Sequence, residues 1–158
     1  MKLHFSALPA ELFNLQLTPK GHYLLINKGA NDDIKEEDIV ISSSGILIGT
    51  VEEVFGSYSK VATVTDVGFK ATISVVFKEI SGIANGAGEN GISIDFISQT
   101  DEVAEGDIIA TRGNDVFPPG LIIGKVVGVS SSGSLFKDVQ VKPALEEINL
   151  SQALIIKK

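Results

Sequence analysis

The sequence predicts an all-β protein built from two small, related β-barrels in tandem, with at most one or two short helices. Three observations lead to this prediction. The composition favours strands and turns over helices, with 19 Ile, 15 Val and 16 Gly but one Met among 158 residues. Short apolar runs alternate with turn-forming clusters along the chain. In addition, one half of the sequence repeats the order of motifs found in the other half.

The strand signals are of two kinds. Segments in which apolar and polar residues alternate predict strands with one buried face; these are residues 71–75, 92–96 and 139–141. Runs that are apolar on both faces predict strands covered on both sides, as at a barrel corner or between two barrels; these are residues 23–26, 108–110, 122–129 and 153–156. Turn clusters separate the strands at 28–33, 42–45, 113–115 and 130–134. Helix-forming residues gather only in 144–152.

The internal duplication pairs three motifs in the same order: 31–40 with 100–109, 45–51 with 120–126, and 58–61 with 136–139. Each copy predicts a turn, a strand, a strand framed by glycines, a loop and a further strand. Glycines are expected at the turns and bends that let a small sheet close on itself. The glycines assigned this structural role are Gly29, Gly45, Gly49, Gly106, Gly120 and Gly124.

A glycine-rich stretch at 82–91 has the most flexible composition in the chain and is interpreted as the joint between the barrels. We therefore expect a first barrel in residues 1–81 and a second barrel in 92–158. The pattern leaves open whether the strand at 153–158 completes the first barrel or belongs to the second.

Charge and hydropathy exclude several classes of function. The net charge of −7 argues against binding nucleic acid, because neutralising phosphates requires clustered Lys and Arg. No stretch approaches the roughly 18 apolar residues of a membrane-spanning helix. The absence of cysteine excludes disulfides and cysteine-ligated zinc, but it does not choose a cellular compartment.

The reactive residues do not form a recognisable catalytic set. The histidines are His4 and His22, and a serine cluster occupies residues 42–44. A two-barrel hydrolase that uses His22 and Ser44 is an alternative hypothesis, although the serine cluster lacks the framing of a nucleophile loop. The acidic run 31–38 lacks the spacing of a calcium loop and is interpreted as a solvated turn. We therefore expect no catalytic residue, no metal and no cofactor.

A glycan-binding module is a second alternative. The absence of Trp and the scarcity of Tyr argue against it, because sugar-binding surfaces rely on flat aromatic faces.

Two aromatic segments are candidates for binding a protein partner. Phe117, Pro118 and Pro119 form a stiff insertion that distinguishes the second copy. Phe117 is expected either to plug the end of its barrel or to anchor a partner, and the first role is favoured because most large apolar residues are buried. Phe55 and Tyr58 flank a Gly-Ser turn and present the same alternatives.

Several of these motifs resemble the MreC family of rod-shape-determining proteins. Residues 23–32, Tyr-Leu-Leu-Ile-Asn-Lys-Gly-Ala-Asn-Asp, are similar to the start of the family's extracytoplasmic region. The most specific similarity is Val-Phe-Pro-Pro-Gly-Leu-Ile-Ile-Gly-Lys-Val at 116–126. Asp33 and Glu37 depart from the family pattern, which has glycine at both positions. We expect Asp33 to keep the first turn, whereas the turn at Glu37 is expected to differ.

The resemblance implies a non-enzymatic scaffold for cell shape and peptidoglycan elongation. Proteins of this family associate with themselves and bind the elongation-specific penicillin-binding transpeptidase. They lie on the extracytoplasmic face of the cytoplasmic membrane, on the periplasmic or cell-wall side. They are anchored there by a helix that this chain does not contain, so the chain would be a fragment of a longer protein.

Overall fold

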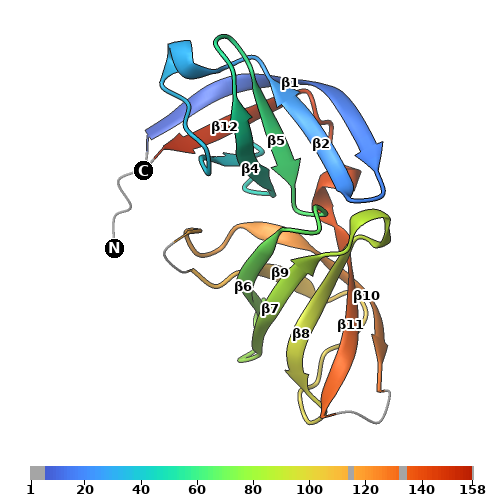
Figure 1. Ribbon diagram of the computed structural model, residues 1–158. Helices are drawn as coiled ribbons and strands as arrows, with labels where there is room; N and C mark the ends of the chain where they lie inside the picture. The colour runs from blue at the N-terminus through green and yellow to red at the C-terminus, as the bar shows by residue number, and fades with distance from the viewer. Residues whose placement is uncertain (1–5, 114–115, 132–134, 158) are drawn as a thin grey trace.

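The computed structural model describes residues 6–113, 116–131 and 135–157, which form two closed barrels (Figure 1). The strands of the first barrel are β1 (Ser6–Thr18), β2 (Gly21–Ile26), β3 (Ile39–Ile41), β4 (Leu47–Val54), β5 (Ser59–Thr63) and β12 (Gln152–Lys157). Those of the second are β6 (Lys70–Val75), β7 (Ser81–Gly86), β8 (Ile92–Ser98), β9 (Ile108–Thr111), β10 (Ile122–Ser130) and β11 (Phe136–Pro143).

The helical content of the described residues is limited to three short 3₁₀ segments. These are η1 (Ala30–Asp32), η2 (Gly88–Asn90) and η3 (Ala144–Glu147). The helix formers at 144–152 thus give one 3₁₀ turn and then lead into β12. The predicted all-β fold of two tandem barrels is confirmed.

The two barrels share one strand order. In the first barrel, β2, β5, β4 and β3 are neighbours, and in the second barrel β8, β11, β10 and β9 take the equivalent places. The remaining two strands are β1 and β12 in the first barrel and β7 and β6 in the second. The second barrel is therefore continuous in sequence, whereas the first takes one strand from a segment about 90 residues further along the chain.

The duplicated turns before β3 and β9 have the same hydrogen bonds. The N–H of Glu37 donates to the carbonyl of Val51 at 2.8 Å, and the N–H of Gly106 donates to that of Val126 at 2.8 Å. Glu37 has φ 73° and Gly106 has φ 94°, so the turn at Glu37 keeps its shape, contrary to expectation. Asp33, with φ 60°, keeps its own turn as expected.

The equivalent glycines of the two copies serve equivalent purposes. A Cβ on Gly49 would overlap the carbonyl oxygen of Ala62 on the neighbouring strand, and a Cβ on Gly124 would overlap that of Lys142. Strands can therefore approach this closely only where the residue has no side chain. Four other glycines were predicted to be structural. Gly45, Gly106 and Gly120 occupy left-handed turns, and Gly29 lies against the backbone of the β4–β5 turn.

The boundary between the barrels differs from the expected one. Residues 70–86 form β6 and β7 of the second barrel, so the changeover lies between β5 and β6 and not at 82–91. The glycines of 82–91 belong to a packed segment: a Cβ on Gly86 would overlap the carbonyl of Asp66, and a Cβ on Gly88 that of Pro19. Gly86 and Gly88 thus let the backbone of the second barrel touch residues of the first barrel and of the connection between the two. Composition alone had suggested that the segment is flexible.

The strand at the end of the described chain belongs to the first barrel. β12 pairs antiparallel with β1 on one side and with β3 on the other, with Ala10 opposite Ala153 and Val40 opposite Ile155. Figure 1 shows this red strand lying beside the blue β1. The alternative that the sequence left open is thereby decided.

The two barrels are joined by a continuous apolar core. One buried apolar cluster contains the interior of the second barrel and also reaches into the first. Its members from the first barrel are Ile39, Leu47 and Ile156, together with Val64, which directly follows β5. Main-chain bonds reinforce this junction: the N–H of Ile122 donates to the carbonyl of Gly45 at 3.0 Å, and the N–H of Gly88 donates to that of Thr65 at 2.8 Å. The barrels are therefore packed together and not merely tethered.

Candidate partner-binding surfaces

The Phe-Pro-Pro segment lies mostly inside the protein. Phe117 is 3% exposed, and its ring centroid lies 5.9 Å from that of Phe69 in the cluster at the barrel junction. The buried hydroxyl of Thr111 donates to the carbonyl of Pro118 at 2.7 Å, which fixes the segment from the barrel side. The side chain of Phe117 is therefore buried in the core, and Pro119 is the exposed member of the three.

The second predicted segment forms an aromatic pair at the surface. The rings of Phe55 and Tyr58 are stacked, with centroids 4.5 Å apart, and Tyr58 is 39% exposed. The carbonyl of Phe55 accepts a hydrogen bond from the N–H of Ala30 at 2.7 Å, which holds the turn against η1. Figure 1 shows this β4–β5 turn at the end of the first barrel that is remote from the second.

The equivalent position in the second barrel also carries an exposed aromatic pair. Phe136, which corresponds to Tyr58 in the duplication, contacts Phe96 edge to face at 5.4 Å. Both rings are more than a third exposed, and Leu135 beside them is exposed too. The sequence analysis pairs Tyr58 with Phe136 through the duplication, but it does not single out Phe96 or Leu135.

Phe77 is the most conspicuous residue that the sequence did not single out. Its side chain is fully exposed, at the turn between β6 and β7, and its φ is 67°. The N–H of Lys78 donates to the carbonyl of Val75 at 3.1 Å, so Phe77 occupies the third position of this turn, where Gly or Asn is preferred. A left-handed conformation costs a residue with a side chain about 1–2 kcal/mol.

Phe77 stands beside a groove with a volume of about 510 Å³ on the outside of the second barrel. The groove is also lined by Arg112 and Pro119 from the segment around the β9–β10 loop. Arg112 is the single arginine of the sequence and is exposed. Exposed aromatic rings, arginine and a stiff proline are the components of an anchoring surface for a protein partner.

The residues of the alternative hydrolase hypothesis are engaged elsewhere. His22 Nδ1 lies 3.2 Å from Thr65 Oγ1, and Ser44 Oγ lies 2.9 Å from Ser42 Oγ. Among the described residues, no hydrogen bond joins His22 to Ser44, and His4 lies outside them. The nearby carboxylate of Asp66 accepts the hydroxyl hydrogen of Tyr23 at 2.6 Å. This hydrogen bond, together with burial and the charges of Asp66 and Glu52, raises the pKa of Tyr23 to about 12.

The acidic turn uses its carboxylates to cap its own backbone. Asp32 accepts from the N–H of Gly29 at 3.1 Å, and Asp38 accepts from the N–H of Lys35 at 2.9 Å. Within the described ranges, no group of three or more His, Cys, Asp or Glu residues is placed to hold a metal ion. The same ranges contain no helix that is long and apolar enough to span a membrane.

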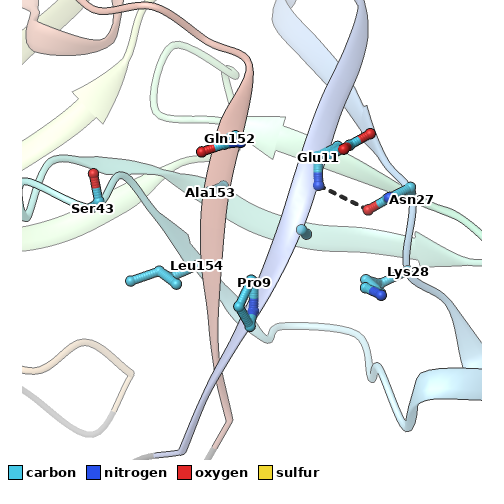
Figure 2. Close-up of a pocket in the computed structure, with 9 residues that line it drawn as sticks. Pro9, Glu11, Asn27, Lys28, Ser43, Gln152, Ala153 and Leu154 are labelled. Atoms are coloured by element: carbon cyan, nitrogen blue, oxygen red, sulfur yellow. Dashed lines mark hydrogen bonds between the residues drawn. The ribbon is translucent and has the colours of Figure 1, made fainter.

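A shallow pocket of about 340 Å³ lies at a seam of the first barrel (Figure 2). Pro9, Ala153 and Leu154 line it, along with Asn27, which follows β2. The pairing of β1 with β2 ends here: the N–H of Asn27 donates to the carbonyl of Glu11 at 3.1 Å, and the N–H of Glu11 donates to Asn27 Oδ1 at 2.8 Å. The pocket thus lies where the pairing of β1 with β2 ends, and the side chain of Asn27 lines it.

Comparison with known proteins agrees with this architecture. The family described as "Rod shape-determining protein MreC, barrel core" matches residues 14–157. None of the curated proteins is similar enough to count as a match. Three solved structures illustrate the likeness. MreC from Pseudomonas aeruginosa is 25% identical, with a TM-score of 0.88 over 96% of this chain and 99% of its own.

The other two structures are less similar in sequence. One is described as the major periplasmic domain from the cell shape-determining filament MreC (20% identity, TM-score 0.74, 99% of this chain and 98% of its own). The other is from a complex between penicillin-binding protein 2 and MreC of Helicobacter pylori (16% identity, TM-score 0.70, 98% and 100%). Because the family match covers most of the sequence, the chain belongs to the rod shape-determining MreC family.

Proposed function

We propose that this chain is a non-catalytic extracytoplasmic scaffold of bacterial cell-shape maintenance and peptidoglycan elongation, which associates with itself and binds wall-synthesis enzymes. The observation that carries the proposal is a double barrel with a shared apolar core and exposed aromatic side chains on both barrels. Such side chains supply large contact areas at little cost in conformational entropy, so they act as anchors in interfaces.

The strained turn at Phe77 gives the clearest support for a binding surface. A fully exposed aromatic residue in a left-handed conformation contributes nothing to the core and costs stability. Backbone strain of this kind concentrates where a protein binds something. Phe77 lines a groove together with Arg112 and Pro119, which suits a protein partner with an apolar residue beside an acidic one.

The relatives indicate which partners to test. One related MreC has been solved in complex with a penicillin-binding protein, and another is described as a periplasmic domain of a filament. By analogy, the partner is the elongation-specific transpeptidase, and the chain would lie outside the cytoplasmic membrane as part of a longer, anchored protein. Phe55, Tyr58 and Pro119 remain the candidate contacts from the sequence, with Phe77, Phe96 and Phe136 added by the structure.

Biolayer interferometry with the extracytoplasmic part of the transpeptidase tests this function. Tyr58→Ala and Phe136→Ala change equivalent positions of the two copies, so the variant that weakens binding by about tenfold or more identifies the barrel in contact. Val67→Ala, which truncates an exposed apolar residue elsewhere, serves as the control. A strictly monomeric chain with no affinity for the transpeptidase would contradict the proposal, and binding to purified peptidoglycan alone would favour the glycan-binding alternative.

A further inference from the structure

Strand β1 has different neighbours along its two halves. Residues 6–11 pair with β12, whereas Leu12 to Thr18 pair with β2 on the opposite side. The N–H of Leu12 still donates to the carbonyl of Ser151 at 2.9 Å. Beyond Leu12, none of the described residues pairs with β1 on the β12 side. Residues 13–18 therefore form an open edge of the sheet.

The unpaired main-chain groups of this edge can be assigned from strand geometry. Thr18 lies opposite Gly21 across the two-residue turn that joins β1 to β2. In an antiparallel hairpin of this kind, the N–H and C=O of the closing residue face the partner strand, and alternate residues follow it. The groups of Thr18 and Gln16 thus face β2, and those of Leu15 and Leu17 face the open edge.

This edge lacks two of the features with which proteins block unwanted strand pairing, charged residues and proline. The other unpaired stretch of β1, residues 6–11 on the side of β2, is blocked. Pro9 has no N–H to donate, and the N–H of Glu11 already donates to Asn27. Between Leu12 and Thr18 there is neither a charge nor a proline. Leu15 is 48% exposed and Leu17 is 69% exposed.

A bulge limits the length of the usable edge. The pairing of β1 with β2 shifts between Phe13 and Gln16, and Asn14 has φ 55°. Bulges bend a strand and interrupt its ladder. The left-handed residue of the bulge is Asn14, so the part of the edge available for pairing runs from Leu15 to Thr18.

We propose that this edge pairs antiparallel with the same segment of a second copy of the chain, around a two-fold axis that passes beside Gln16. The proposal rests on the self-association included in the proposed function and names the surface that would perform it. Leu15 would lie opposite Leu17 of the second copy, and Gln16 opposite its own equivalent. The four groups of Leu15 and Leu17 in each copy would then form about four main-chain hydrogen bonds.

The sequence of the edge favours a second copy over a different partner. Residues 14–18 read Asn-Leu-Gln-Leu-Thr, so the alternation of polar and apolar residues is the same in both directions. Antiparallel pairing around a two-fold axis therefore places apolar side chains opposite apolar ones. The net charge of −7 opposes association of two copies in general, but this segment contributes no charge to that repulsion.

Crosslinking tests the register directly, because the chain contains no native cysteine. Residues that face each other in the non-hydrogen-bonded sites of an antiparallel pair have Cα atoms about 4.5 Å apart, within the range for a disulfide. Gln16→Cys should therefore form a disulfide-linked dimer at least about tenfold faster than Val127→Cys, an exposed control on the second barrel. Equal rates would overturn the proposal.

Sedimentation of the 158-residue chain supplies a second measurement. Leu17→Lys places like charges near each other across the axis and should raise the dimer dissociation constant at least about tenfold. Val127→Lys introduces a lysine at an exposed site on the second barrel and should leave the dimer intact. Unchanged circular dichroism and melting would show that both variants are folded.

Two outcomes would overturn this pairing: a Leu17→Lys variant that dimerises like the wild type, or a wild-type chain that stays monomeric at about 1 mM. Self-association through another surface would leave the proposed scaffold function standing. A chain that neither self-associates nor binds the transpeptidase would remove both proposals.

Discussion

Replacing Glu37 with glycine should stabilise the protein. Glu37 has φ 73° in a turn whose copy in the second barrel has Gly106 at φ 94°, with matching hydrogen bonds. Removing the side chain relieves about 1–2 kcal/mol of left-handed strain. Glycine also raises the conformational entropy of the unfolded chain, which lowers the free energy of unfolding by about 0.4–1 kcal/mol. The net expectation is a gain of about 0.5–1 kcal/mol in the free energy of unfolding.

The surroundings of Glu37 make this a clean measurement. The residue is exposed, and within the described part of the chain its side chain has no hydrogen bond or ion pair. Urea unfolding followed by circular dichroism gives the free energy by linear extrapolation, provided that the slope is unchanged. Glu37→Ala removes the same negative charge but keeps the Cβ, so it separates the backbone effect from reduced repulsion in a chain of charge −7.

The reverse substitution completes the comparison. A Cβ on Gly106 would meet no atom within 4 Å, so Gly106→Ala changes only the backbone preference and should destabilise by about 0.5–1 kcal/mol. If Glu37→Gly destabilises, or if Glu37→Ala stabilises as much as Glu37→Gly, then strain at the turn is not what the residue contributes.

Three further predictions concern the core, the tyrosine at the junction and the glycine bends. Phe117→Ala should lower the free energy of unfolding by about 3–5 kcal/mol in the same urea assay, because the ring fills the core, and a change below about 1 kcal/mol would show that it does not. Absorbance titration should give Tyr23 a pKa of about 12, and Asp66→Ala should lower this pKa. The folded-state pKa lies above the usual value of about 10. The hydrogen bond to Asp66 therefore stabilises the fold fully below about pH 10, and this contribution is lost as the pH rises through about 12. Gly124→Ala should destabilise more than Gly128→Ala on the same strand, since only the first Cβ overlaps a carbonyl, and equal melting temperatures would contradict this.

The fold could be predicted because its signals are local. The alternation at 71–75 and 92–96 gives β6 and β8, and the turn motifs around Gly45 and Gly120 recur with φ 88° and 89°. Duplication of such motifs implies duplication of the structure. The division into barrels was wrong because strand pairing is not local: periodicity shows that 70–75 is a strand, but not that its neighbours are β7 and β9.

The candidate surfaces were predicted in part. Aromatic residues next to turns drew attention to Phe55 and Tyr58, which are paired at the surface. Phe117 has the same kind of sequence context but lies in the core, because the junction of two barrels buries a loop that one barrel alone would expose. Phe77 was missed because its distinguishing feature is a positive φ, and a Phe flanked by Val and Lys gives no sign of that.

The origin of β12 has a consequence for the order in which the chain can fold. All six strands of the second barrel lie between residues 70 and 143, so this barrel can close as soon as that stretch has been made. The first barrel has five of its strands much earlier, but β1 and β3 stay unbridged until residues 152–157 arrive. During synthesis, the earlier-made half is thus the one completed last. A chain that ends before residue 152 would contain a complete second barrel and an incomplete first barrel. The unpaired edges of β1 and β3 would then be available for aggregation.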